Sequence, residues 1–151
     1  MKSFSTHSED ETIALGRQLA HELPRRGVVL LIGNLGAGKT ALSKGILAGL
    51  GVASPEEVTS PTFTLIHDYG SAFHIDLYRL DTAKEVAALG LEDLFDLDAM
   101  VLIEWGERFP QLMPENRVEI RIEASGDDRR FEVSEAQRDR GGPESAPNRD
   151  R

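Results

Sequence analysis

The sequence predicts an α/β domain, a three-layer sandwich with a mostly parallel central sheet and antiparallel edge strands. Residues 28–32 are a continuous run of valine, leucine and isoleucine, which is typical of a strand buried on both faces of a parallel sheet. Helical spacing of apolar residues precedes this run and also follows it. A glycine-rich octet over residues 33–40 joins the run to the second helix.

The first helix is predicted to begin at Ser8. Ser8 and Glu11 have the spacing of a capping box, and the acidic residues between them suit the positive end of a helix dipole. From Leu15 to Leu23 leucine recurs every four residues, which indicates one apolar face. Pro24 is expected to end this helix.

The later elements are predicted by the same patterns and by turn residues. We expect a helix near residues 39–51, a hairpin of residues 63–69 and 73–78, a short helix from Thr82 toward Leu89, an apolar strand at 99–103, a half-exposed strand at 118–122 and a last edge strand at 131–133.

Residues 1–133 are expected to form a single domain. Residues 134–151 contain no large apolar side chain, so we expect a disordered tail there. No apolar run approaches the length needed to cross a bilayer, and cysteine is absent, so the sequence predicts a cytoplasmic protein with no membrane partner.

The charge balance argues against tight nucleic-acid binding by this chain alone. The formal net charge is −9 and the pI is about 4.9, whereas nucleic-acid binding usually depends on a basic face. Lysine occurs only at positions 2, 39, 44 and 84. Direct, tight binding of tRNA or DNA by this chain alone is therefore not expected, and the alternative is a local basic patch of arginines brought together by folding.

The octet Gly33–Thr40 fits the phosphate-loop pattern G-x-x-x-x-G-K-[ST], which makes the predicted fold P-loop NTPase-like. Glycines let the backbone N–H groups turn toward phosphate oxygens, and the following helix adds its positive end. Lys39 can reach the β- and γ-phosphates, and Thr40 can offer its hydroxyl to Mg²⁺. The expected ATP-binding residues of this octet are Gly33, Gly36, Ala37, Gly38, Lys39 and Thr40.

Two other nucleotide classes fit the sequence less well. Gly36–Ala41 also fits a looser dinucleotide pattern, but the acids at the required spacing, Glu56 and Glu57, follow no predicted strand. No lysine is followed by x-Asp, so the guanine-reading motif of Ras-type GTPases is absent. ATP is therefore favoured over GTP, and a small-molecule kinase remains an alternative because such kinases carry the same loop.

Two acids can complete the site at the edge where parallel strands end. Glu104 directly follows the apolar run at 99–103, and we assign it with Thr40 to Mg²⁺. Asp76 lies on the polar face of the stretch 73–78, and we assign it to orienting the attacking water or the metal's water shell. Lys39, Asp76 and Glu104 are thus the candidate catalytic residues, while an ion pair at the surface is the alternative for each acid.

Thr59, Ser60 and Thr62 occupy the position of a switch loop that could sense the γ-phosphate, although a proline-stiffened turn is the alternative. Trp105 follows Glu104 and is expected either to pack in the core, to contact a partner or to support the site. The histidines show no zinc-ligand spacing, so no zinc site is predicted.

These motifs occur in an order that closely resembles the TsaE family. The resemblance covers residues 5–133, and the blocks that carry it are Leu35–Thr40, Thr59–Phe63, His74–Leu80 and Ile103–Trp105, the last followed by Glu107 and Arg108.

The resemblance implies a weak ATPase subunit of bacterial tRNA threonylcarbamoyladenosine synthesis. It implies that the chain acts with TsaD and TsaB, and that ATP hydrolysis resets this assembly for another turnover. It also implies that Gly36 to Lys39, Thr40 and Ala41 contact the phosphates of ATP. Glu9 and Arg129 are implied to flank the nucleotide, with Arg130 as an alternative to Arg129. A non-catalytic nucleotide sensor is a further alternative.

Overall fold

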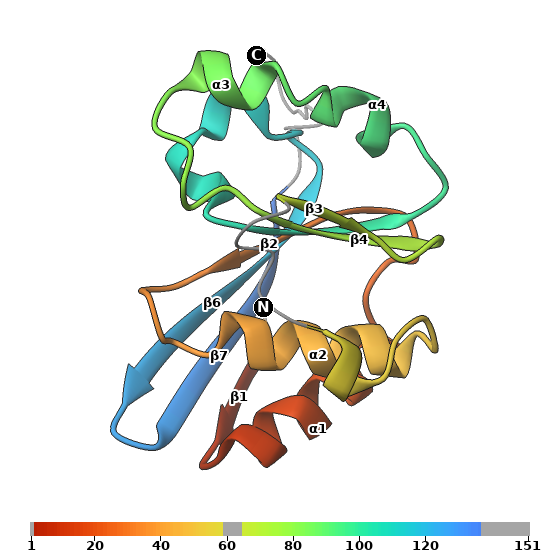
Figure 1. Cartoon of the computed structure of the whole chain (residues 1–151). Coiled ribbons are helices and arrows are strands. Elements are labelled where there is room, and N and C mark those ends of the chain that lie inside the picture. Colours follow the sequence, from red (N-terminus) through yellow and green to blue (C-terminus); the bar gives the residue numbers. More distant parts are fainter. Residues whose placement is uncertain (1, 59–64, 137–151) are drawn as a thin grey trace, which may run out of the picture.

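The computed structural model describes residues 2–58 and 65–136. Its strands form one seven-stranded sheet in the order β1-β7-β6-β2-β5-β4-β3 (Figure 1). Their bounds are β1 Lys2–Thr6, β2 Gly27–Ile32, β3 Ile66–Asp68, β4 Ala72–Asp76, β5 Met100–Glu104, β6 Arg117–Ser125 and β7 Asp128–Ala136.

The centre of the sheet is parallel and its margins are antiparallel, as predicted. β6 pairs in parallel with β2, β2 with β5, and β5 with β4. β3, β7 and β1 are antiparallel to their neighbours. In this register Leu31 pairs with Glu104, and Glu104 pairs with Asp76, so the ends of three strands lie side by side.

Helices cover both faces of the sheet and complete the three layers (Figure 1). On one face lie α1 and α2, and on the other lie α3 and α4 with two short 3₁₀ turns. Their bounds are α1 Glu9–Leu19, α2 Lys39–Gly49, α3 Ala83–Ala87, α4 Leu91–Phe95, η2 Gly106–Arg108 and η3 Pro110–Leu112, with η1 at Pro55–Glu57.

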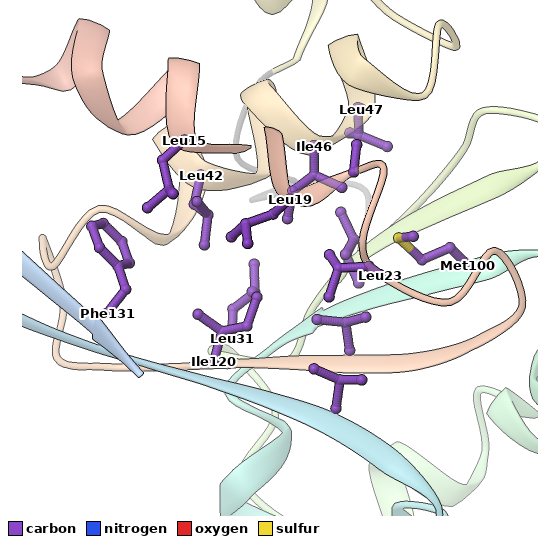
Figure 2. Close-up of a cluster of buried hydrophobic side chains, with 14 of the residues drawn as sticks. Leu15, Leu19, Leu23, Leu31, Leu42, Ile46, Leu47, Met100, Ile120 and Phe131 are labelled. Atoms are coloured by element: carbon purple, nitrogen blue, oxygen red, sulfur yellow. The ribbon is translucent and has the colours of Figure 1, made fainter. Parts of the chain in front are cut away.

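The larger core lies between α1, α2 and the sheet (Figure 2). Leu19 and Leu42 from the helices pack there against Leu31, Ile120 and other buried residues from the strands. A second cluster on the opposite face joins the sheet to α3, α4 and the 3₁₀ turns. The run at 28–32 therefore contributes side chains to both clusters. Val29 and Leu31 belong to the first, and Val28 and Leu30 belong to the second.

The start of α1 departs slightly from a capping box. The hydroxyl of Ser8 accepts a hydrogen bond from the Glu11 N–H at 3.1 Å, as expected, but the Glu11 carboxylate accepts from the His7 N–H at 2.7 Å. The helix ends at Leu19, before Pro24, and Leu23 packs in the same core from the following turn.

The margin of the sheet formed by β1 and β7 differs from the sequence-based expectation. β1 was not predicted, because its alternation depends on Phe4 among serines and threonine, and it forms the outer edge. β7 therefore lies inside the sheet and is not the edge strand that we expected. β7 also extends to Ala136, so residues 134–136 pair with β6; the rest of the expected tail lies outside the described residues.

α1 and α2 pack closely because glycines face each other at their contact. A Cβ added to Gly16 would lie 2.6 Å from the Leu42 carbonyl oxygen and 2.8 Å from the Gly45 Cα. A Cβ on Gly45 would collide with the Ile13 carbonyl group. The obstacles are backbone atoms, which cannot rotate away as a flexible side chain can.

We therefore predict that Gly16→Ala lowers the free energy of unfolding by about 1–3 kcal/mol, because the helices must separate. In an exposed helix the same change would raise stability by up to about 1 kcal/mol, so the sign alone tests the contact. Urea unfolding measures the difference. The control Gln18→Ala, at an exposed position of α1, should stay within about 0.5 kcal/mol of the wild type.

Candidate nucleotide-binding site

A cavity of about 770 Å³ opens where the central parallel strands end. It receives side chains from the start of α1, the glycine-rich loop, the start of α2, the ends of β4 and β5, and the β6–β7 hairpin. Its lining residues are His7, Ser8, Glu9, Thr12, Leu35, Gly36, Gly38, Lys39, Thr40, Ala41, Asp76, Tyr78, Arg79, Glu104, Trp105, Asp127 and Arg129.

The loop conformation requires glycine at two of its positions. Gly36 has φ 81° and Gly38 has φ 109°, values that L-side chains rarely adopt. Gly38 is the N-cap of α2 and provides no side chain to cap it. Backbone N–H groups in the first turn of α2 therefore have no intrahelical acceptor and are suited to bind an anion.

Gly33 and Ala37 belong to the loop but do not line the cavity. A Cβ on Gly33 would lie 2.8 Å from the Ile122 carbonyl oxygen, so glycine allows the loop to pack against β6. The Gly33 carbonyl oxygen also accepts a hydrogen bond from Lys39 Nζ at 2.8 Å. In this structure Gly33 supports the loop and holds the lysine, whereas Ala37 packs in the larger core.

Lys39 is 4% exposed, which is unusual for a lysine, and its ammonium group has two kinds of partner. Besides the Gly33 carbonyl oxygen, Nζ lies 3.5 Å from the centroid of the Trp105 ring, in a cation–π contact. Burial lowers the pKa of Lys39, and the negative charges of Glu104, Glu107 and Asp76 oppose that shift. The lysine is thus held beside carboxylates in the lining of the cavity.

Trp105 combines an unusual backbone with aromatic contacts. Its φ of 68° is the only positive φ of a non-glycine residue in the described chain. Its ring lies 5.1 Å from that of Tyr78, centroid to centroid. A backbone in this sparsely populated region persists only where surrounding contacts fix it, and such residues cluster at functional sites. Of the roles left open for Trp105, support of the site is the one that this geometry favours.

Arg108 holds the segment that follows β4. Its Nη2 donates hydrogen bonds to the carbonyl oxygens of Leu77, Tyr78 and Leu80 at 2.6–2.9 Å. Asp76 Oδ1 accepts from the Tyr78 N–H at 2.9 Å, so the same segment is tied to the candidate acid. Sequence reasoning gave Arg108 no role, because its acceptors are backbone groups that no side-chain pattern reveals.

The two predicted acids are neighbours. Asp76 and Glu104 end β4 and β5 as a register pair, and both line the cavity. Glu104 also has a hydrogen-bond partner that was not predicted from the sequence. This partner is His74, whose Nε2 lies 2.7 Å from Glu104 Oε2. The available signal was that His74 and Asp76 share one face of the predicted strand.

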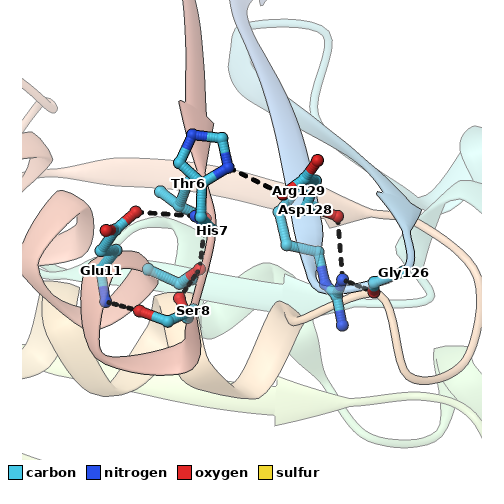
Figure 3. A network of polar contacts seen from close by, with 8 residues as sticks. Thr6, His7, Ser8, Glu11, Gly126, Asp128 and Arg129 are labelled. Atoms are coloured by element: carbon cyan, nitrogen blue, oxygen red, sulfur yellow. Dashed lines mark hydrogen bonds and ion pairs between the residues drawn. The ribbon is translucent and has the colours of Figure 1, made fainter.

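Another part of the cavity lining is built from segments far apart in the sequence (Figure 3). His7 Nδ1 lies 2.7 Å from Asp128 Oδ1 and links the end of β1 to the β6–β7 hairpin. Arg129 Nη1 donates to the carbonyl oxygens of Gly126 and Asp128. Arg129 Nε lies 3.6 Å from the position of a Cβ on Gly38, so this arginine approaches the loop. Arg130 does not line the main cavity, which favours Arg129 of the two candidates.

Most of the predicted site residues therefore meet at one cavity. Glu9, Gly36, Gly38, Lys39, Thr40, Ala41, Asp76, Glu104, Trp105 and Arg129 line it. The predicted switch residues Thr59, Ser60 and Thr62 lie outside the described residues.

A strand, the Gly33–Thr40 loop and a helix in this order, on a sheet with a parallel centre, define a P-loop NTPase-like α/β protein. The model of the family described as "Threonylcarbamoyl adenosine biosynthesis protein TsaE" matches residues 6–131 of the chain. The chain belongs to the TsaE family.

Individual relatives agree with this assignment. The tRNA threonylcarbamoyladenosine biosynthesis protein TsaE of Haemophilus influenzae is 35% identical over 144 residues, which cover 88% of this chain and 90% of that protein. The protein of the same name from Bacillus subtilis is 36% identical over 131 residues, covering 84% and 80%. The crystal structure of Bacillus subtilis YdiB matches with a TM-score of 0.70 and 30% identity, covering 89% of this chain and 84% of that one. Within residues 2–58 and 65–136, the helices lack the length and hydrophobicity that a membrane span requires.

Glu107 lies beside the site in an unfavourable environment. Its Oε1 is buried and has no hydrogen-bond partner among the described residues. Burial raises the pKa of Glu107, while a backbone hydrogen bond and the positive charges of Lys39, Arg108 and Arg121 partly oppose the shift. A raised pKa in the folded state means that ionised Glu107 destabilises the fold at pH values above that pKa.

We predict that Glu107→Gln raises the thermal midpoint, and that the gain grows as the pH rises through the pKa of the folded state. The gain should vanish below about pH 4, where the side chain is protonated in both the folded and the unfolded chain. Thermal melts between acidic and neutral pH measure it. Glu123→Gln, at an exposed position of β6, is the control and should show no such pH-dependent gain. An equal midpoint for wild type and Glu107→Gln at neutral pH would contradict the prediction.

Proposed function

We propose that the chain is the ATP-binding and ATP-hydrolysing component of the tRNA threonylcarbamoyladenosine synthesis machinery. In this proposal it is a weak cytoplasmic ATPase whose turnover depends on TsaD and TsaB. The observation that supports it most strongly is that Lys39 and Thr40 line one cavity with the carboxylates of Asp76 and Glu104. The net charge of −9 favours tRNA contact through the partners rather than through this chain.

Phosphate binding would use groups that are already in position. The N–H groups at the start of α2 can donate to phosphate oxygens, and the ammonium group of Lys39 can neutralise their charge. In this structure the ammonium group contacts the Gly33 carbonyl oxygen and the Trp105 ring. We infer that phosphate oxygens replace some of these contacts and offer the buried lysine a stronger, charged partner.

The donor atoms in the cavity fit Mg²⁺. The described residues contain no group of three or more His, Cys, Asp or Glu side chains able to hold a metal. Magnesium is commonly held instead by one or two protein oxygens together with phosphates and water, and Thr40 and Glu104 would supply those oxygens. When bound, Mg²⁺ would offset the negative charge that develops during phosphoryl transfer.

Asp76 would orient the attacking water. Asp76 is 9% exposed and lines the cavity, and the Tyr78 N–H donates to one of its carboxylate oxygens. A positioned carboxylate of this kind can accept a hydrogen bond from water and align it. Glu9 and Arg129, which also line the cavity, would flank the rest of the nucleotide.

We predict that Lys39→Ala weakens ATP binding by about 10- to 100-fold, because hydrogen bonds to charged groups contribute about 1.5–3 kcal/mol. Calorimetric titration of ATP measures the loss. The control Lys44→Ala removes a lysine of α2 that does not line the cavity, and it should leave the affinity unchanged. Equal affinity of wild type and Lys39→Ala would contradict a phosphate-binding role.

Partner dependence predicts that ATP turnover rises when TsaD and TsaB are both added, and that the γ-phosphate is released as free phosphate. Phosphate release with and without the partners tests this, with Glu104→Gln as the impaired reference. Brisk turnover in isolation that the partners leave unchanged would contradict the proposal. Label from the γ-phosphate on a metabolite would favour a small-molecule kinase, and intact tRNA modification by Asp76→Ala would favour a non-catalytic sensor.

A further inference from the structure

His74 is the most deeply buried ionisable residue beside the site. Its side chain is 0% exposed on β4, which lies between β3 and β5. Its Nε2 atom lies 2.7 Å from Glu104 Oε2, and the Glu104 side chain is only 4% exposed. The contact is diagonal across the parallel pair, because the register places His74 opposite Leu102 and Glu104 opposite Asp76.

The hydrogen-bond pattern around His74 selects one tautomer. Nδ1 is buried and has no hydrogen-bond partner among the described residues. A proton on Nδ1 would therefore be a buried donor without an acceptor, which is more costly than an unused lone pair. The arrangement that fits has the proton on Nε2, where the imidazole donates it to the Glu104 carboxylate.

Packing alone does not account for this pair. His74 and Glu104 lie on the face of the sheet that carries the larger apolar core, to which Leu102 and Leu31 belong. Burial of a polar pair among apolar side chains is costly, and apolar residues of similar volume would pack there at lower cost. What distinguishes Glu104 is that it also lines the cavity.

We propose that His74 is a positioning residue for the metal-binding carboxylate. By donating to Oε2, it fixes the orientation of the Glu104 carboxylate, so that Oε1 would be the oxygen available to a cation. This inference rests on the proposed function, because it assumes that Glu104 contributes to a Mg²⁺–nucleotide site. It assigns His74 no contact with nucleotide and no proton transfer.

The direct readout is the coupling between Mg²⁺ and ADP. Calorimetry gives the ADP dissociation constant in EDTA and in saturating Mg²⁺, and the ratio of the two measures how much the cation strengthens binding. Loss of a group that orients a metal ligand typically weakens metal binding about 10- to 100-fold, so His74→Leu should reduce this ratio by about tenfold or more. The dissociation constant in EDTA should stay unchanged, because His74 does not line the cavity.

Two further variants separate positioning from packing. His74→Gln places an amide N–H near the position of Nε2 and should restore most of the coupling. Phe73→Leu perturbs the opposite face of the same strand, where Phe73 packs in the second cluster, so it should lower stability and leave the coupling unchanged. If His74→Leu does not fold, His74→Asn takes its place, since its amide is too short to reach Glu104.

A folded His74→Leu or His74→Asn variant with wild-type coupling would overturn the inference. The same follows if Phe73→Leu reduces the coupling as much as the His74 variant does. If wild-type protein binds no ADP under either condition, the proposed function fails. By contrast, if the wild type shows strong coupling and the His74 variants retain it, only the positioning role of His74 fails, and the proposed ATP site stands.

Discussion

The parallel pairing of β2, β5 and β4 determines where the chemistry of this protein can lie. Because the three strands run in the same direction, their carboxyl ends meet at one edge of the sheet. The glycine-rich loop leaves β2 there, Glu104 ends β5 there, and Asp76 ends β4 there. The loop and the acids are far apart in the sequence, and this register alone brings them to one cavity.

The charges at that edge depend on one another. A buried lysine is tolerated because an aromatic face, a carbonyl oxygen and nearby carboxylates compensate its charge. One carboxylate oxygen of Glu104 is hydrogen-bonded to His74. Arg108 donates hydrogen bonds to the backbone carbonyl groups that follow Asp76. Each group near the expected phosphate position is thus held by a second group behind it, which reduces the reorganisation that ligand binding requires.

The elements that the sequence predicted well are those with a local signal. The run at 28–32 and the loop Gly33–Thr40 are contiguous patterns of this kind. Glu9 and Arg129 have no local pattern; the family resemblance pointed to them, and both line the cavity. β1 contains a single large apolar residue, so its sequence shows no clear strand alternation. Its position in the sheet depends on pairing with β7, more than 120 residues later in the chain. The role of His74 was hidden for a similar reason, since its partner is on another strand.

The position of β1 has a consequence for how the chain is made. β1 is at the start of the sequence, yet its one hydrogen-bonded neighbour among the described strands is β7, near the end. A nascent chain emerging from the ribosome therefore cannot pair its first strand until the last hairpin has been synthesised. Until then the backbone of β1 has no strand partner, and His7 cannot form its contact with Asp128 in the part of the cavity wall beside Arg129. The outermost strand and that wall of the cavity must be completed after translation has passed the hairpin, so the wall is absent from every shorter intermediate.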